Sequence, residues 1–148
     1  MAEYYLISQL PSLDAVTENA QLPITEERFL ELCSSFLTKK ALNEIKKITL
    51  CPSLDFEKSS SNVIENWNLG ECKLRLALSK ARAEKLGKTV DIKNQNLPLE
   101  LIKLANAAVE FQNPLEAEMF LLKHRLDFLE GLRPMDNFSE DFVFYYGI

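Results

Sequence analysis

The chain has 148 residues, of which 47% are hydrophobic and 26% are charged, a composition typical of one globular domain. Its formal net charge of -5 argues against a dedicated nucleic-acid-binding protein, because contacts to phosphate supply most of the affinity of such proteins. The four glycines are too few for a turn-rich sheet protein and favour helices. The three cysteines include no CxxC pair, so we expect reduced thiols packed as small apolar side chains in a cytoplasmic protein.

The N-terminal stretch EYYLISQLP, residues 3–11, is apolar on both faces if the chain is extended. We expect a short extended segment that is buried among helices and ended by Pro11. A loop over residues 12–24 is expected to follow. The next stretch, TEERFLELCSSFL, predicts a helix because Thr25 can cap the free amides and two glutamates occupy its first turn.

Three further helices are predicted in the middle of the chain. The stretch TKKALNEIKKITL, residues 38–50, repeats a helical apolar pattern. Residues 53–62, SLDFEKSSSN, are polar and rich in Ser, which predicts a mobile loop. Residues 62–88 predict the longest helix, which Gly70 interrupts and Gly87 ends. Pro98 fits the first position of the helix after that, PLELIKLANAAVEFQ.

Residues 113–132, NPLEAEMFLLKHRLDFLEGL, carry complete signals for a helix start and stop. Asn113 can cap the helix, Pro114 fits its first position, Glu116 can reach back to the cap amide, and Gly131 supplies the stop. Apolar residues recur inside at heptad-like spacing, at Leu115, Met119, Leu122, Leu126 and Leu129. We expect this helix to be central to the core or to face a partner.

The final stretch DNFSEDFVFYYGI, residues 136–148, predicts a helix that either Asn137 or Ser139 caps. Its apolar run from Phe142 to Tyr146 meets no stop signal, which predicts a truncated form of a longer chain with an exposed apolar end. Together the patterns predict a mainly α protein, a single domain over residues 1–148 built as a bundle of about six helices with an extended N-terminal segment.

The acidic residues and the single His in residues 113–132 invite an enzymatic or metal-binding interpretation, which their spacing does not support. A di-iron bundle needs Glu three residues before His, and Leu121 stands there before His124. Glu116 and Glu118 are two residues apart, so they point to different faces of a helix. Glu118 and Arg125 share a face, and we expect them to make contacts or inter-helix pairs, together with His124, Arg75 and Arg82. We therefore expect no catalytic residues, no metal and no cofactor.

The basic helix over residues 71–88 is the second candidate site. Its pairs Lys73 with Lys80 and Arg75 with Arg82 repeat at seven residues, and Trp67 stands just upstream. Nucleic-acid binding through this helix is the alternative function. The plainer interpretation is a solvated face with ion pairs such as Glu71 to Arg75.

A third interpretation concerns charge balance. Residues 71–93 hold seven Lys or Arg against three acids, whereas residues 116–141 hold seven acids against three Lys or Arg. Two helices of opposite charge are then expected to pair with each other or each with a partner.

Three blocks together resemble a known family: YYLISQLPSL, then NWNLGECKLRLALSKARAEKLGK, then PLEAEMFLLKHRLDFLEGL with FSEDFVFYYGI. The family comprises bacterial proteins of unknown function encoded among V-type ATPase genes. The last two segments are also weakly similar to the adaptor of V/A-type ATPases, an all-helical protein that seats the central stalk on the membrane rotor ring.

The resemblance implies a non-enzymatic accessory or structural protein in ion transport, cytoplasmic and held peripherally at the inner membrane through a complex. The partners it implies are V-type ATPase subunits rather than nucleic acid. Because no apolar run approaches about 18 residues, no direct membrane insertion is expected.

Overall fold

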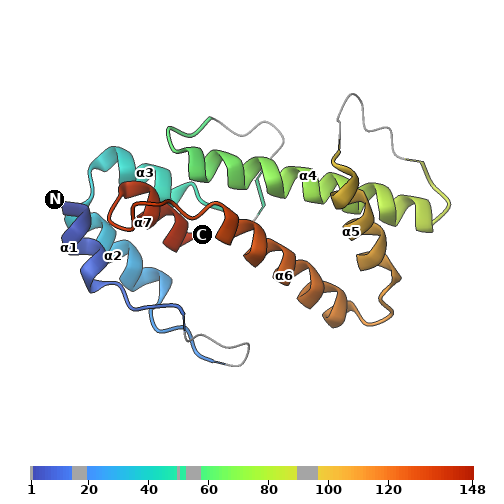
Figure 1. The fold of residues 1–148 in the computed structure, drawn as a ribbon, viewed down its shortest axis with the longest axis horizontal. Coiled ribbons are helices and arrows are strands. Elements are labelled where there is room, and N and C mark those ends of the chain that lie inside the picture. The colour runs from blue at the N-terminus through green and yellow to red at the C-terminus, as the bar shows by residue number, and fades with distance from the viewer. Residues whose placement is uncertain (1, 15–19, 50, 53–57, 90–96) are drawn as a thin grey trace. The chain divides into compact units, whose positions relative to one another are not determined.

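A computed structural model describes residues 2–14, 20–49, 51–52, 58–89 and 97–148, and within these ranges the chain forms seven helices and no strand (Figure 1). The helices are α1 (Ala2–Gln9), α2 (Glu26–Phe36), α3 (Lys39–Lys46), α4 (Asn62–Lys85), α5 (Leu99–Glu110), α6 (Pro114–Gly131) and α7 (Glu140–Gly147). The prediction of a mainly α protein is confirmed. None of the described helices is both long enough and apolar enough to cross a membrane.

The chain divides into two compact units. The first, which we call the terminal unit, comprises Met1–Thr49, Ser59–Ile64 and Arg133–Ile148; the second, the central unit, comprises Leu50–Lys58 and Glu65–Leu132. The terminal unit contains α1, α2, α3, α7 and the first residues of α4, and the central unit contains the rest of α4 with α5 and α6. The expectation of one domain over residues 1–148 stays a prediction.

The terminal unit is built around large apolar side chains. Its buried cluster contains Leu6, Phe29, Leu32, Cys33, Ala41, Ile45, Ile64, Val143 and Phe144. Hydroxyl caps begin three of its helices: Thr25, Thr38 and Ser139 each accept a bond from a backbone N–H in the first turn. Such caps satisfy amides that the helix itself leaves free, so they fix where each helix starts.

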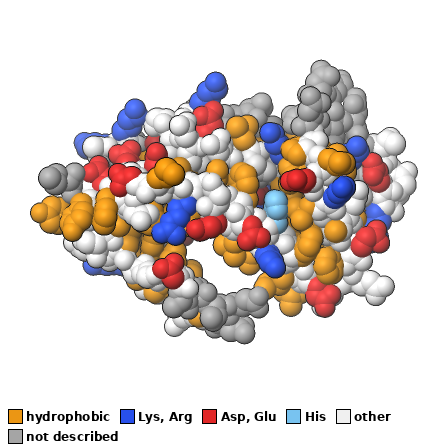
Figure 2. Space-filling view, viewed as in Figure 1, with side chains coloured by type: hydrophobic (Ala, Val, Ile, Leu, Met, Phe, Trp, Pro, Cys, Tyr) orange, Lys and Arg blue, Asp and Glu red, His pale blue; other side chains and the backbone are white. Residues whose placement is uncertain are grey.

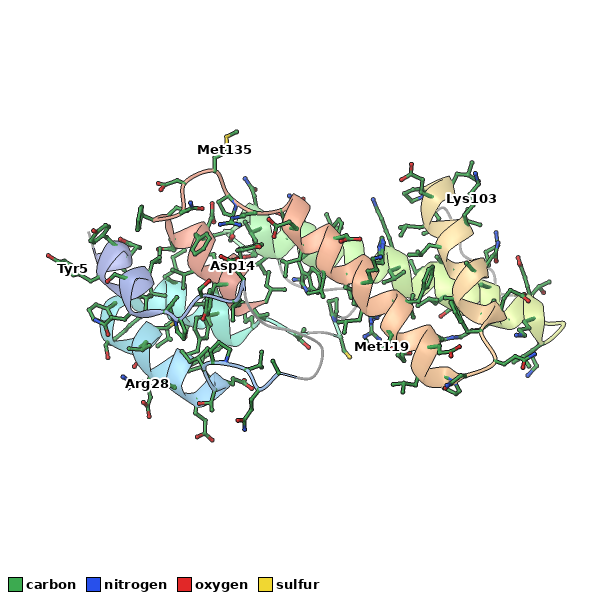
Figure 3. The ribbon with its side chains drawn as sticks, turned by 60° about the horizontal axis from the view of Figure 1, so that its bottom comes forward. Tyr5, Asp14, Arg28, Lys103, Met119 and Met135 are labelled. Atoms are coloured by element: carbon green, nitrogen blue, oxygen red, sulfur yellow. The ribbon has the colours of Figure 1, made fainter. Side chains whose placement is uncertain are left out.

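The N-terminal segment is a helix, so the prediction of an extended segment is wrong. Leu6 is fully buried while Tyr4 and Tyr5 are exposed, and Figure 3 shows Tyr5 at the outer side of α1. Ile7 and Leu10 pack on the same cluster as Leu6. Their spacing is that of a helix face, whereas in an extended chain Leu6 and Ile7 would point to opposite sides.

The apolar stretch in α7 is packed rather than exposed. Val143 and Phe144 are buried, and Phe142, Tyr145 and Tyr146 are half-buried. The Tyr146 hydroxyl donates a 2.6 Å hydrogen bond to the Pro11 carbonyl, so burial of this ring leaves no polar atom unpaired. The expectation of an exposed apolar end is therefore wrong, since α7 supplies core residues to the terminal unit.

The structure describes only part of the predicted loop over residues 53–62. Residues 53–57 lie outside the described residues, and Asn62 already belongs to α4. Ser59 donates a 2.5 Å hydrogen bond to the Glu44 carboxylate, and Ser61, which is buried, donates a 3.0 Å bond to Asp141. These bonds fix Ser59 and Ser61, so the end of the predicted mobile loop is ordered.

In the central unit, α4 runs without a break through Gly70, contrary to the expected interruption. A Cβ at Gly70 would meet Cζ and Cε1 of Phe128, so glycine lets the two helices approach closely there. Gly87 ends the helix as predicted, with φ at +71°. The amides of Gly87 and Lys88 donate to the carbonyls of Glu84 and Ala83, the paired bonds of a Schellman motif.

The core of the central unit is made mostly of small side chains. Its buried cluster contains Leu74, Ala77, Leu78, Ala81, Ala105, Ala108 and Leu121, contributed by α4, α5 and α6. The Lys85 ammonium donates to the Val109 carbonyl, which links the end of α4 to the end of α5. Pro98 occupies the N-cap of α5 instead of its first helical position.

Candidate functional site

The most distinctive polar group of the central unit is the carboxylate of Glu71 on α4. Its side chain is 2% exposed, although Glu is almost never fully buried unless it is paired. Glu71 stands three and seven residues before Leu74 and Leu78, so the helical repeat places it at the edge of the buried face.

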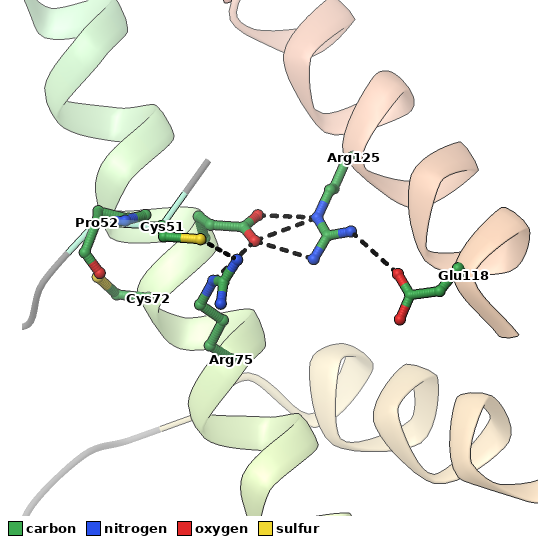
Figure 4. A network of polar contacts seen from close by, with 7 residues as sticks. Cys51, Pro52, Cys72, Arg75, Glu118 and Arg125 are labelled. Carbon is green, nitrogen blue, oxygen red and sulfur yellow. Dashed lines mark hydrogen bonds and ion pairs between the residues drawn. The ribbon is translucent and has the colours of Figure 1, made fainter. Parts of the chain in front are cut away.

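Arg125 on α6 supplies the main counter-ion (Figure 4). Its Nε donates to both Glu71 oxygens, at 3.2 Å and 3.1 Å, and its Nη2 donates to Oε1 at 3.0 Å. The planar guanidinium matches a carboxylate in this way, which adds geometric specificity to the charge attraction. Arg125 is 20% exposed, so the pair is largely shielded from solvent.

Two further groups extend the network. Arg75, one turn after Glu71, donates from Nε to Oε1 at 3.2 Å and from Nη2 to the Cys51 sulfur at 3.3 Å. Glu118 lies 4.0 Å from Nη1 of Arg125 and is 62% exposed. We call Glu71, Arg75, Glu118 and Arg125 the ion cluster. It holds two carboxylates and two guanidiniums, so its formal charges balance.

The ion cluster joins α4 to α6 through the buried carboxylate of Glu71. Two arginines donate four bonds to the Glu71 carboxylate, and burial of a carboxylate is costly unless such bonds compensate it. The predicted ion pair of Glu71 with Arg75 is confirmed.

The cluster also bears on the expected pairing of a basic helix with an acidic helix. At this contact the charges are the reverse of those expected. The basic segment supplies the acidic side chain, Glu71, and the acidic segment supplies the basic one, Arg125. Net charge describes the exposed faces, whereas a buried contact depends on the individual side chains.

Trp67 is buried, with 3% of its surface exposed, and its ring lies 6.1 Å from that of Phe128. It is therefore a core residue and offers no surface on which a base could stack. Within the described chain, neither Trp67 Nε1 nor the neighbouring Asn68 Oδ1 has a hydrogen-bond partner.

The remaining basic residues of α4 face solvent to different degrees. Lys73 and Arg82 are exposed, and Lys80 is half-buried. The described residues bring none of the three into an ion pair, and Arg82 does not join the ion cluster. Their outward position fits the solvated face that the sequence favoured.

His124 is half-buried on α6. Burial lowers the pKa of its imidazole below the ordinary value of 6.5, and Arg125 lowers it further, while Asp127 and Glu71 act in the opposite direction. No hydrogen bond joins His124 to Glu116 or Glu118 within the part of the chain that is described.

The predicted caps of α6 hold only in part. Asn113 Oδ1 accepts a 3.0 Å bond from the Leu115 amide, as an N-cap does. Glu116 lies in the first turn, where the helix dipole favours an acid, but its exposed side chain makes no bond back to the Asn113 amide among the described residues. Gly131 is the last residue of α6, so the helix stops where predicted, but Gly131 has no positive φ and Leu132 is the C-cap.

The cysteines differ from one another in burial. Cys33 and Cys72 are buried, and burial raises the pKa of both thiols, that of Cys33 to about 11. Cys51 is exposed, so the expectation of a packed thiol is wrong there. Within the described residues, no group of three or more His, Cys, Asp or Glu is placed to hold a metal ion.

Sequence reasoning missed the central role of Glu71, which it treated as a surface ion-pair partner. The available signal was an acid in line with Leu74 and Leu78 on the apolar face of α4. No protein-family model matches the chain, and searches of curated proteins and of solved structures find no match either.

Proposed function

We propose that this protein is a non-enzymatic interaction subunit, and specifically an accessory component of a bacterial V-type ATPase that acts as an adaptor between the central stalk and the membrane ring. The resemblance of the three sequence blocks to the family encoded among V-type ATPase genes suggests this assignment. The proposal places the protein in the cytoplasm, held at the inner membrane through its partners.

The observation that carries the proposal is the contact between Arg125 and the buried Glu71 carboxylate. An adaptor that transmits force needs helices held in fixed positions. The guanidinium fork joins α4 to α6 with directional bonds, which resist sliding better than apolar contacts alone. Glu71 and Arg125 both lie in the blocks that resemble the family. Under the proposal, their contact serves to hold α4 and α6 together.

The exposed basic residues of α4 are the natural contact points for a partner under this proposal. Lys73 and Arg82 are exposed and lie on a segment with excess positive charge. Charges of this kind steer association and choose partners more than they stabilise the fold.

Copurification from native membranes tests the proposal. Tagged full-length protein should carry ATPase subunits with it, and the K73E/R82E variant should carry far fewer while its helix content stays unchanged. Lys103→Glu is the matched control, since Lys103 is exposed on α5 (Figure 3) and outside the basic helix. Failure of the native protein to travel with ATPase subunits, together with intact ATP-driven pumping in a deletion strain, would contradict the proposal.

Nucleic-acid binding through residues 71–88 is the rival function. Trp67 is buried, so its ring cannot stack on a base. Binding through this helix would therefore depend on the exposed Lys and Arg side chains alone. Retention on heparin with a steep loss at rising salt would support it. Flow-through at low salt would remove it.

A further inference from the structure

The outward face of α6 carries a continuous row of exposed apolar side chains. Leu115, Met119, Leu122 and Leu126 are 67%, 36%, 45% and 57% exposed. We call these four residues the outer stripe. Apolar side chains reach the surface over α5 and α6 in Figure 2, and Figure 3 labels Met119 on α6.

The outer stripe has the spacing of a coiled-coil seam. Its members follow one another at steps of four, three and four residues, which keeps them in line along a helix and is the repeat that lets two helices pack knobs into holes. The opposite face of α6 is already used, because Leu121 is 1% exposed in the core and Phe120 packs beside it. α6 therefore has an inner apolar face that is covered and an outer one that is not.

The charges beside the outer stripe are self-complementary. Glu116 and Lys123 flank it on one side, both are exposed, and neither has an ion-pair partner among the described residues. If a second α6 lies antiparallel, Leu115 meets Leu126 of the second copy and Met119 meets its Leu122. In that arrangement Glu116 faces Lys123 of the second copy, and the two-fold axis repeats the pair.

We propose that two copies of this chain associate through the outer stripe of α6, with the two helices antiparallel. The other flank agrees in sign, because Glu118 is brought near Arg125 of the second copy. A parallel pair would use the same four layers but would set Lys123 near Glu118 of the second copy, and it would leave Glu116 without an opposite charge on the second α6. The antiparallel pair gives both Glu116 and Lys123 a partner of opposite charge.

The association is weak and depends on concentration. A seam of four layers is short. The surface area that it can bury is well below the total of about 1,200 Å² at which stable interfaces begin. Self-association of this kind goes beyond the proposed adaptor function and does not depend on it.

Sedimentation velocity over a concentration series tests the association with the full chain. The wild-type protein shifts from monomer to dimer, and Leu126→Glu raises the dissociation constant by at least about tenfold, because each dimer loses two buried leucines. Leu86→Glu is the matched control, since Leu86 is 73% exposed at the end of α4 and outside the stripe. A wild-type chain that stays monomeric at its highest soluble concentration overturns the proposal and leaves the stripe to a different protein.

A charge swap tests the antiparallel arrangement. Lys123→Glu weakens the dimer, and the double variant E116K/K123E restores it, because each pair keeps opposite charges after the exchange. In a parallel pair the second change cannot restore the contact with Glu118. A double variant as weak as Lys123→Glu alone therefore overturns the antiparallel arrangement, and circular dichroism confirms that all variants keep their helix content.

Discussion

The terminal and central units bury different kinds of side chain. The terminal cluster contains two phenylalanines and several branched residues, whereas four of the seven buried members of the central cluster are Ala. Small side chains let helices approach closely but remove less apolar surface from water. The central unit adds the ion cluster, whose directional bonds specify how α6 meets α4. Packing of large apolar side chains stabilises the terminal unit, whereas in the central unit a polar contact adds to the packing of small apolar side chains.

The largest expected effect lies in the terminal unit. Phe144 is 1% exposed, and Phe144→Ala should lower the free energy of unfolding by about 3–5 kcal/mol, because a cavity replaces the ring. Phe138, which is half exposed, provides the control, and Phe138→Ala should change stability by less than about 0.5 kcal/mol. Chemical denaturation measures both, and equal losses would show that the apolar cluster is not the basis of the terminal unit.

A smaller effect with an unusual sign is expected in the central unit. Gly→Ala within a helix ordinarily stabilises it, but at Gly70 the new Cβ would push the Phe128 ring against Trp67. Gly70→Ala should therefore destabilise the protein by about 1–3 kcal/mol. At Gly131 nothing lies within 4 Å of the added Cβ, so Gly131→Ala should be neutral or stabilising in the same thermal melt. A stabilising Gly70→Ala would contradict the close approach of α4 and α6.

The sequence predicted the helices that carry local signals. Thr25 and Asn113 begin helices as their hydroxyl and amide oxygens indicated, and Gly87 ends one. The short N-terminal stretch misled, because a run of eight residues fits a strand and a helix almost equally well. The predicted helix break at Gly70 was wrong for another reason. The close contact that requires a glycine there is made with the ring of Phe128, which is far away in the sequence.

The ion cluster was predictable only in its local half. Glu71 and Arg75 are one helical turn apart, so spacing alone indicated their pair. Arg125 lies 54 residues from Glu71, and their contact depends on how α6 packs. The heptad-like apolar pattern of α6 was visible in the sequence, but periodicity cannot say whether an apolar face is covered. Four of its five residues, those of the outer stripe, prove to be exposed.

The smallest expected effects concern pH, and they have opposite signs in the two units. Burial lowers the pKa of His124 in the central unit, so the unfolded chain binds more protons there and stability is lost as pH falls through and below 6.5. Burial raises the pKa of Glu140 in the terminal unit above 4.5, so its folded form binds more protons and stability is lost as pH rises from 4.5 through the raised value.

Thermal melts between pH 4 and pH 8 measure these trends. His124→Gln should flatten the slope below pH 6.5 and leave the slope just above pH 4.5, which belongs to Glu140, in place. An unchanged slope near pH 6 would show that His124 keeps its ordinary pKa in the folded chain.

A double-mutant cycle on Glu71 and Arg125 tests the central claim that this buried pair holds α4 to α6. Glu71→Leu and Arg125→Met should each destabilise the protein by about 2–4 kcal/mol, because each leaves a shielded charge with fewer partners. The double variant should lose less than the sum, with a coupling energy of at least about 1.5 kcal/mol. The exposed pair of Arg28 and Glu31 on α2, 3.2 Å apart, is the control and should couple by less than about 0.5 kcal/mol. A coupling energy for Glu71 and Arg125 as small as that of the control would contradict the account.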